Sequence, residues 1–267
     1  MLLSRHHASL LALGLLLGMW SAPALAQTAG CGLPAVTGVS TVTLWVNGVQ
    51  RSYVLSVPST YQPTIPSRLV FAWHGLGGSG QTIRSHNVEY GLSGIAVYPN
   101  ALPCPQFGGQ TCWDLDPMGQ DVAFYDAMLA HLEAHFCIHP HRIVDYGFSF
   151  GGAMTNLIAC VRQRSTRAVA VDAGWLPDAG CDGPVSYWAE HADDDQAVSI
   201  TAGRAAKEFW RNMDSCSATT TPVWPSPCVA STGCQSGFAV TWCELPQGGH
   251  TWYTWTSQAI AAFLSQY

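Results

Sequence analysis

The sequence predicts an α/β fold in which a mostly parallel sheet is covered by helices on both faces. Continuous apolar runs, such as residues 69–73 and 95–98, are typical of strands that are buried on both sides. Segments with apolar residues at helical spacing alternate with these runs, as in proteins whose parallel strands are joined by helices. The ten cysteines, an even number, indicate disulfide bonds that staple the surrounding loops.

The first predicted elements form a β-hairpin. Val42, Leu44 and Val46 alternate with polar residues, and Asn47-Gly48 then favours a tight turn before a second strand at residues 53–57. Further strands are predicted at 69–73, 95–98, 142–146, 168–172, 185–190 and 238–244. Helices are predicted at 121–136, with Asp121 as the N-cap, and at 151–162, 198–213 and 256–265. Residues 214–237, which include three cysteines, are expected to form one irregular surface loop.

Residues 1–26 have the pattern of a secretory signal peptide. Arg5 precedes a short apolar run at residues 10–20, and Ala24-x-Ala26 resembles a cleavage site. The run is shorter than the ~20 residues that span a membrane. A lipoprotein signal ending at Cys31 would leave an odd number of cysteines. We therefore expect a single domain at residues 27–267, exported after cleavage near Ala26, with no membrane partner.

The charge balance excludes one class of partner. Only 10% of the residues are charged, and 17 acidic residues outnumber 11 basic ones, which gives a net charge of −6. Proteins that bind nucleic acid need a basic surface for the phosphates, so no nucleic-acid partner is expected.

A candidate nucleophile lies where the strand at 142–146 turns into the next helix. Gly147-Phe-Ser149-Phe-Gly151 matches the Gly-x-Ser-x-Gly nucleophile elbow of α/β-hydrolases, in which tight turning demands glycine on both sides of the serine. In this fold the acid and then the histidine follow the serine along the chain. His250 comes after the last predicted strand and is the expected base, whereas His191 precedes the acid candidates.

The acid should follow the strand at 185–190. Asp193, Asp194 and Asp195 all occupy this position, each could instead cap the next helix, and Asp172 is an outside candidate. The oxyanion hole needs backbone N–H groups. Phe150, directly after the serine, should supply one. The glycine-rich loop after residue 73 should supply the other, through Leu76 or else Gly77, with His74 as a structural residue of that loop.

These pieces together resemble the secreted feruloyl esterases of types C and D and related polyhydroxybutyrate-depolymerase-like esterases of carbohydrate esterase family 1. The resemblance covers nearly the whole chain after residue 30. Its motifs are Cys31-Gly-Leu-Pro, His74-Gly-x-Gly-Gly, Trp113-Asp114, Asp121-Val-x-Phe, Cys137-Ile, Arg142-Ile, Gly147-Phe-Ser-Phe-Gly-Gly, Ile158-Ala-Cys, Pro225-Ser-Pro-Cys, Val240-Thr-Trp-Cys and Gly248-Gly-His-Thr. The family's His-Gly-x-x-Asp acid motif corresponds to residues 191–195 and selects Asp195, although Ala192 replaces the glycine.

The resemblance implies hydrolysis of hydroxycinnamoyl esters, such as ferulate on plant cell-wall polysaccharide, without a cofactor. Trp113 and Trp252 are candidates to stack on the phenolic ring. No metal site is expected, because the spacing of His131, Glu133 and His135 does not match a metal-binding helix motif. The alternatives are an acetyl xylan esterase or polyester depolymerase with the same triad, and a secreted binding protein on an inactive hydrolase scaffold. Local disulfides are expected at Cys104–Cys112 and Cys228–Cys234.

Overall fold

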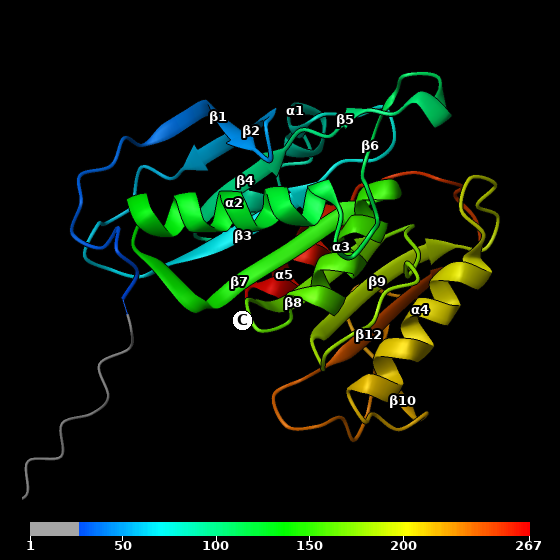
Figure 1. Cartoon of the computed structure of the whole chain (residues 1–267). Coiled ribbons are helices and arrows are strands. Elements are labelled where there is room, and N and C mark those ends of the chain that lie inside the picture. The colour runs from blue at the N-terminus through cyan, green and yellow to red at the C-terminus, as the bar shows by residue number, and fades with distance from the viewer. Residues whose placement is uncertain (1–26) are drawn as a thin grey trace, which may run out of the picture.

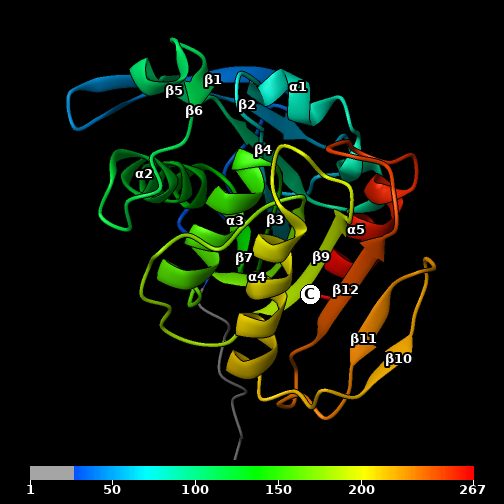
Figure 2. The same cartoon turned by 90° about the vertical axis from the view of Figure 1, so that its right-hand side faces the viewer.

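The computed structural model describes residues 27–267 and contains a ten-stranded sheet (Figures 1 and 2). The predicted signal peptide lies outside the described residues. In sheet order the strands are β1 (Gly38–Val46), β2 (Val49–Val57), β4 (Ile95–Pro99), β3 (Ser67–Trp73), β7 (Ile138–Phe148), β8 (Thr166–Asp172), β9 (Ser186–Ala192), β12 (Val240–Leu245), β11 (Val229–Ser231) and β10 (Thr220–Pro222). The six strands from β4 to β12 are parallel, and antiparallel hairpins form both edges.

Helices cover both faces of this sheet, as predicted. On one face lie α2 (Gln120–His135), α3 (Phe150–Val161) and α4 (Ile200–Met213), which stand in front of the sheet in Figure 1. On the other lie α1 (Gly80–Arg84), the 3₁₀ segment η1 (Val88–Gly91) and α5 (Thr256–Leu264). Strand β3 shows why its sequence is continuously apolar: Phe71 and Trp73 pack under α2 and α3, whereas Val70 and Ala72 pack on the opposite side.

The N-terminus of α2 corrects one prediction. Gly119, not Asp121, is the N-cap, and Asp121 lies buried in the first turn. Its carboxylate accepts a hydrogen bond from the backbone N–H of Asp114 at 2.6 Å and pairs with Arg51 of β2. The prediction was wrong because a distant arginine binds the carboxylate that was expected to cap the helix.

The stretch at 214–237 also differs from its prediction. It contains the short β10–β11 hairpin, paired from Thr220 with Ser231 to Pro222 with Val229, which extends the sheet beyond β12. These strands are three residues long and partly or fully exposed, so they lack the apolar alternation by which a strand is found in a sequence.

Five disulfides join all ten cysteines, which confirms that the cysteines form disulfide bonds, as predicted. The pairs are Cys31–Cys137, Cys104–Cys112, Cys160–Cys181, Cys216–Cys234 and Cys228–Cys243. Cys104–Cys112 is confirmed and staples β5 (Leu102–Pro103) to β6 (Thr111–Cys112) across η2 (Pro105–Phe107). Cys228–Cys234 is wrong, because β11 lies beside β12 and brings Cys228 to Cys243 instead.

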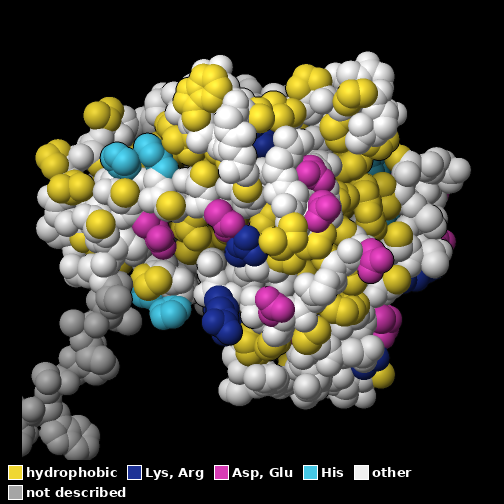
Figure 3. All heavy atoms as spheres, viewed as in Figure 1, with side chains coloured by type: hydrophobic (Ala, Val, Ile, Leu, Met, Phe, Trp, Pro, Cys, Tyr) yellow, Lys and Arg dark blue, Asp and Glu magenta, His cyan; other side chains and the backbone are white. Residues whose placement is uncertain are grey.

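The surface carries few charges. In the view of Figure 3, basic and acidic side chains are scattered among uncharged ones and form no single-sign patch. Within residues 27–267, no helix is long and apolar enough to cross a membrane. In the same range no group of three or more His, Cys, Asp or Glu side chains could hold a metal ion.

Candidate active site

The candidate site lies at the carboxyl ends of β3, β7, β9 and β12. Because these strands are parallel, the loops that follow them meet at one edge of the sheet. They carry His74 to Gly78, Ser149, Asp195 and His250 respectively.

Ser149 stands on a strained turn between β7 and α3. Its backbone has φ 57° and ψ −120°, a combination that non-glycine residues rarely adopt. Neither of the glycines that flank Ser149 has room for a side chain. A Cβ on Gly147 would lie 2.2 Å from the Gly151 carbonyl oxygen, and a Cβ on Gly151 would lie 1.9 Å from the Trp73 carbonyl oxygen. The turn therefore has the geometry of a nucleophile elbow.

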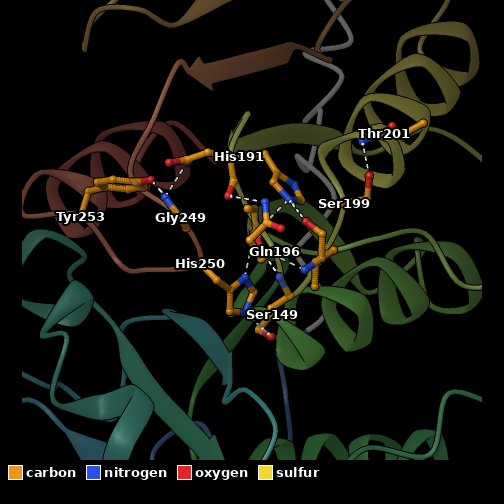
Figure 4. A network of polar contacts seen from close by, with 12 residues as sticks. Ser149, His191, Gln196, Ser199, Thr201, Gly249, His250 and Tyr253 are labelled. Carbon is orange, nitrogen blue, oxygen red and sulfur yellow. Dashed lines mark hydrogen bonds and ion pairs between the residues drawn. The ribbon is translucent and has the colours of Figure 1, made fainter.

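Three of the predicted residues form a hydrogen-bonded chain. The Oγ of Ser149 lies 2.7 Å from Nε2 of His250, and Nδ1 of His250 lies 2.7 Å from Oδ2 of Asp195 (Figure 4). An ionised carboxylate only accepts hydrogen bonds, so Nδ1 carries the proton. Nε2 is then free to accept the hydroxyl proton of Ser149, as a general base requires.

The surroundings of Asp195 keep it ionised. Its side chain is fully buried, and burial alone would raise its pKa. The hydrogen bond from His250 and those from the backbone N–H groups of Val198 and Ala197, at 2.9 and 2.8 Å, outweigh this effect and lower the pKa. The same carboxylate thus orients the histidine and caps the turn that leads into α4.

The other two aspartates of the triplet face elsewhere. Asp193 is exposed and pairs with Arg204 at 3.0 Å. Asp194 accepts a 2.7 Å hydrogen bond from the backbone N–H of Gly249, next to His250. That bond lowers the pKa of Asp194. Asp194 therefore ties down the histidine loop, a role that the sequence did not reveal.

His191 is a second residue that supports the triad, and it lies beside Asp195. The sequence pattern did not predict this role. Its Nε2 lies 2.8 Å from the Val198 carbonyl oxygen and 3.3 Å from Oδ2 of Asp195. Burial lowers the pKa of His191, so the ring is neutral at pH 7 and donates from Nε2. Gly203 of α4 makes room for it, since a Cβ there would lie 2.4 Å from Nδ1. In the sequence, the signal for this contact is Gly203, a glycine in the interior of a predicted helix.

Two segments place backbone N–H groups beside Ser149, where the oxyanion donors are predicted. Phe150 is the first residue of α3, where helix N–H groups have no partner within the helix. Gly75 brings the other loop against Ser149, because a Cβ on Gly75 would lie 3.3 Å from the Cβ of Ser149. The N–H of Gly77 already donates to the Thr111 carbonyl at 2.8 Å, which favours Leu76 over Gly77 as the second donor.

His74 is a structural residue of this loop, as predicted. It is 1% exposed, and its Nε2 accepts a hydrogen bond from the N–H of Ala101 at 3.1 Å. Its Nδ1 then donates to the Gly75 carbonyl at 2.7 Å. Burial lowers the pKa of His74 to about 4, so the ring stays neutral and holds the loop.

The residues that precede and follow Ser149 in the chain line two different hollows. The Leu76 hollow, about 260 Å³, is lined by His74, Gly75, Leu76, Gly77, Gly78, Thr82, Ile83, His86 and Phe148. The Phe150 hollow, about 340 Å³, is lined by Leu102, Pro103, Cys104, Pro105, Gln106, Cys112, Trp113, Asp114, Leu115, Gln120 and Phe150. The residues on either side of Ser149 thus belong to different hollows. The two halves of an ester can accordingly lie on opposite sides of the serine.

The two tryptophans predicted to stack on a substrate lie mostly inside the protein. Trp113 is only 2% exposed, packs edge-to-face on Trp73, and donates from its indole N–H to the His74 carbonyl at 2.8 Å. It supports the His74 loop, and the small part of it that stays exposed lines the Phe150 hollow. Trp252 is half-buried and stacks on His86 with 4.2 Å between ring centres, so His86 rather than Trp252 lines the Leu76 hollow.

Two buried carboxyl groups lie beneath the site. Asp172 and Glu190 are register partners on β8 and β9, and both are 1% exposed. Burial raises the pKa of Glu190 to about 8 and raises that of Asp172 well above its usual value. The backbone carbonyl of Asp172 accepts from the N–H of Ser149 at 2.9 Å, so Asp172 supports the elbow through its main chain. Its side chain makes no bond to His250, which removes it as the acid candidate.

Comparison with known proteins identifies the family. No family model matches the chain. Feruloyl esterase D of Neurospora crassa is 33% identical over 248 residues, which cover 85% of each chain. A probable feruloyl esterase C of Aspergillus terreus is 36% identical over 214 residues, which cover 73% of each chain. The chain belongs to the feruloyl esterase C/D family.

Solved structures agree with the fold of this family. An acetyl xylan esterase from Aspergillus awamori superposes with a TM-score of 0.65 at 14% identity, over 84% of this chain and 99% of that one. A carbohydrate esterase family 1 ferulic acid esterase from Anaeromyces mucronatus, solved in complex with ferulic acid, gives 0.58 at 15% identity, over 85% and 90%. These neighbours confirm the predicted α/β-hydrolase fold for this feruloyl esterase C/D chain.

Proposed function

We propose that the protein is a secreted feruloyl esterase that hydrolyses hydroxycinnamoyl esters of plant cell-wall polysaccharides. The hydrogen-bonded chain from Ser149 through His250 to Asp195, on an elbow in a member of the feruloyl esterase C/D family, carries this proposal. Residues 27–267 form the catalytic domain, and residues 1–26 direct export. Five disulfides support an oxidising compartment.

The mechanism follows from the distances. Nε2 of His250 takes the hydroxyl proton as Oγ of Ser149 attacks the ester carbonyl carbon. The backbone N–H groups of Phe150 and Leu76 stabilise the oxyanion. Collapse of the tetrahedral intermediate breaks the bond to the sugar oxygen, which leaves with the proton from His250. Water, deprotonated by the same nitrogen, then attacks the acyl-enzyme, releases the hydroxycinnamic acid and regenerates Ser149.

We assign the phenolic acyl group to the Phe150 hollow. Its walls combine apolar side chains, Leu102, Pro105 and Phe150 among them, with the amides of Gln106 and Gln120. Such a lining suits a flat ring that carries a hydroxyl and a methoxy group. Its volume of about 340 Å³ is within the range of small-molecule sites. The alcohol side of the ester then leaves toward the Leu76 hollow.

Initial rates on methyl ferulate, an acetyl ester and a hydroxybutyrate oligomer test this function, with Ser149→Ala as the control. The highest kcat/KM is expected for methyl ferulate, and Ser149→Ala should abolish the activity. A higher kcat/KM for the acetyl ester or the oligomer would replace feruloyl esterase by acetyl xylan esterase or polyester depolymerase. Equal rates for Ser149→Ala and the parent protein would exclude every serine-esterase function, including the proposed mechanism.

A further inference from the structure

Three neighbouring grooves lie between the candidate active site and the β10–β11 hairpin, and each shares one lining residue with the next. The Leu76 hollow shares His86 with a groove of about 600 Å³, the α5 groove, which lies between η1 and α5. The α5 groove in turn shares Ala262 with a groove of about 220 Å³ under the β10–β11 hairpin, the hairpin groove. In Figure 2, α5 lies between the segment after α1 and this hairpin. The grooves thus follow one another away from Ser149.

Exposed aromatic rings stand along these grooves. Tyr90 of η1 lines the α5 groove and is 80% exposed, and Trp224, in the β10–β11 connection, lines the hairpin groove and is 57% exposed. Folding buries little of the Tyr90 ring and less than half of the Trp224 ring, so both rings keep aromatic surface that is available to stack on a ligand. Tyr90 and Trp224 thus line the second and third grooves of the series that begins at the Leu76 hollow.

The exposed face of α5 supplies neutral polar groups between the rings. Gln258, Ala262 and Gln266 recur every four residues and are all exposed, so they form one stripe on the order of 12 Å long. Asn87 and Thr254 add further exposed amide and hydroxyl groups to the α5 groove. Amides and hydroxyls both donate and accept, as partners of sugar hydroxyls must.

The charge of the lining residues limits which ligand the three grooves can bind. None of the described residues that line the three grooves is Lys, Arg, Asp or Glu. Burial lowers the pKa of His86, so the ring shared by the first two grooves is neutral at pH 7. A phosphorylated, acidic or basic partner would find no counter-charge there. A neutral polysaccharide, whose rings have C–H faces and hydroxyl edges, matches stacking rings and neutral amides.

We propose that the α5 groove and the hairpin groove bind the polysaccharide chain that carries the ester, with Tyr90 and Trp224 as stacking platforms. This proposal rests on the proposed function, which places the alcohol side of the ester in the Leu76 hollow, and that hollow adjoins the α5 groove at His86. The polymer runs from the ester toward β10 and β11. The grooves therefore set a preference for polymeric over small esters without any contact to the reacting atoms.

The test compares feruloylated arabinoxylan with methyl ferulate, which has no sugar to place in the grooves. For the Tyr90→Ala/Trp224→Ala double variant, the ratio of kcat/KM on the polymer to kcat/KM on methyl ferulate should fall about fivefold or more, mainly through KM. Gln258→Ala tests the α5 groove without removing a ring. Trp45→Ala is the matched control, because Trp45 is 72% exposed on β1 and lines none of these grooves.

A binding measurement separates this proposal from the proposed function. On a Ser149→Ala background, co-sedimentation with insoluble arabinoxylan should weaken when Tyr90 and Trp224 are replaced, and should be unchanged by Trp45→Ala. Unchanged ratios and unchanged binding in the double variant, or equal losses in the Trp45→Ala control, would overturn the grooves as a polysaccharide site. Absence of any methyl ferulate hydrolysis by the parent protein would instead overturn the esterase.

Discussion

Replacing Asp195 by asparagine tests which aspartate of the triplet orients His250. In the parent protein, the Asp195 carboxylate accepts two hydrogen bonds on Oδ1 from backbone N–H groups and one on Oδ2 from Nδ1 of His250. In Asp195→Asn, the amide oxygen should stay with the two backbone donors, which turns the amide NH₂ toward His250. That NH₂ donates, so the histidine proton must move from Nδ1 to Nε2. Nε2 then cannot accept the Ser149 proton.

The expected loss of activity is large, because His250 can no longer act as the base. The fold should be unaffected. The equivalent substitution in other Ser-His-Asp enzymes lowers kcat by about 10⁴, which corresponds to about 5.4 kcal/mol in the activation free energy. Asp194→Asn should cost at most about tenfold, because its amide oxygen can still accept from Gly249. Asp193→Asn is the surface control, since the Asp193 side chain is exposed and, among the described residues, pairs with Arg204 alone.

The assay is the initial rate on methyl ferulate at pH 7, with the melting temperature of each variant measured in parallel. An Asp195→Asn variant within tenfold of the parent, or a loss of about 10³ in Asp194→Asn at an unchanged melting temperature, would refute the assignment of the acid.

Three further predictions concern stability. Gly151→Ala places a Cβ 1.9 Å from the Trp73 carbonyl oxygen and should lower the free energy of unfolding by more than about 3 kcal/mol. A urea midpoint equal to that of the parent protein would contradict the tight turn at Ser149. Removing Cys31–Cys137, whose sequence separation is 106, should cost about 4–5 kcal/mol by the chain-entropy model, and a loss below about 1 kcal/mol would count against a tied N-terminal segment. Between pH 6.5 and 8 the folded protein retains a proton on Glu190, whose pKa is about 8, which the unfolded chain has already released. The free energy of unfolding should therefore fall with rising pH by about 1.4 kcal/mol per unit per proton, and an equally steep fall in Glu190→Gln would exclude this source.

Local patterns predicted the features that depend on a few neighbouring residues. Ser149 could be placed because the tight turn demands glycine on both sides, and His250 because the fold imposes an order along the chain. The central strands were found because burial on both faces leaves a continuous apolar run. Their ends were less certain: β7 runs from Ile138 to Phe148, well beyond the predicted 142–146.

Features that depend on distant partners could not be found this way. The three consecutive aspartates are chemically alike, and only the turn after β9 sends Asp195 inward, Asp194 to Gly249 and Asp193 to solvent. Trp113 was a candidate to stack on the phenolic ring, but its indole N–H binds a carbonyl 39 residues away and only 2% of the residue is exposed. The strands of the β10–β11 hairpin are three residues long and at least partly exposed, and only their neighbour β12 reveals them as part of the sheet.

The disulfide connectivity has a consequence for how the chain must be produced. If each cysteine paired with the next one to emerge during export, only Cys160–Cys181 of the five native bridges would form. Cys31 would capture Cys104, and the interleaved pairs that end at Cys234 and Cys243 would be exchanged. With sequential pairing, four of the five native bridges would have to be reached by thiol–disulfide exchange. The yield of active enzyme should depend on a host that supplies a disulfide isomerase, and not merely an oxidant.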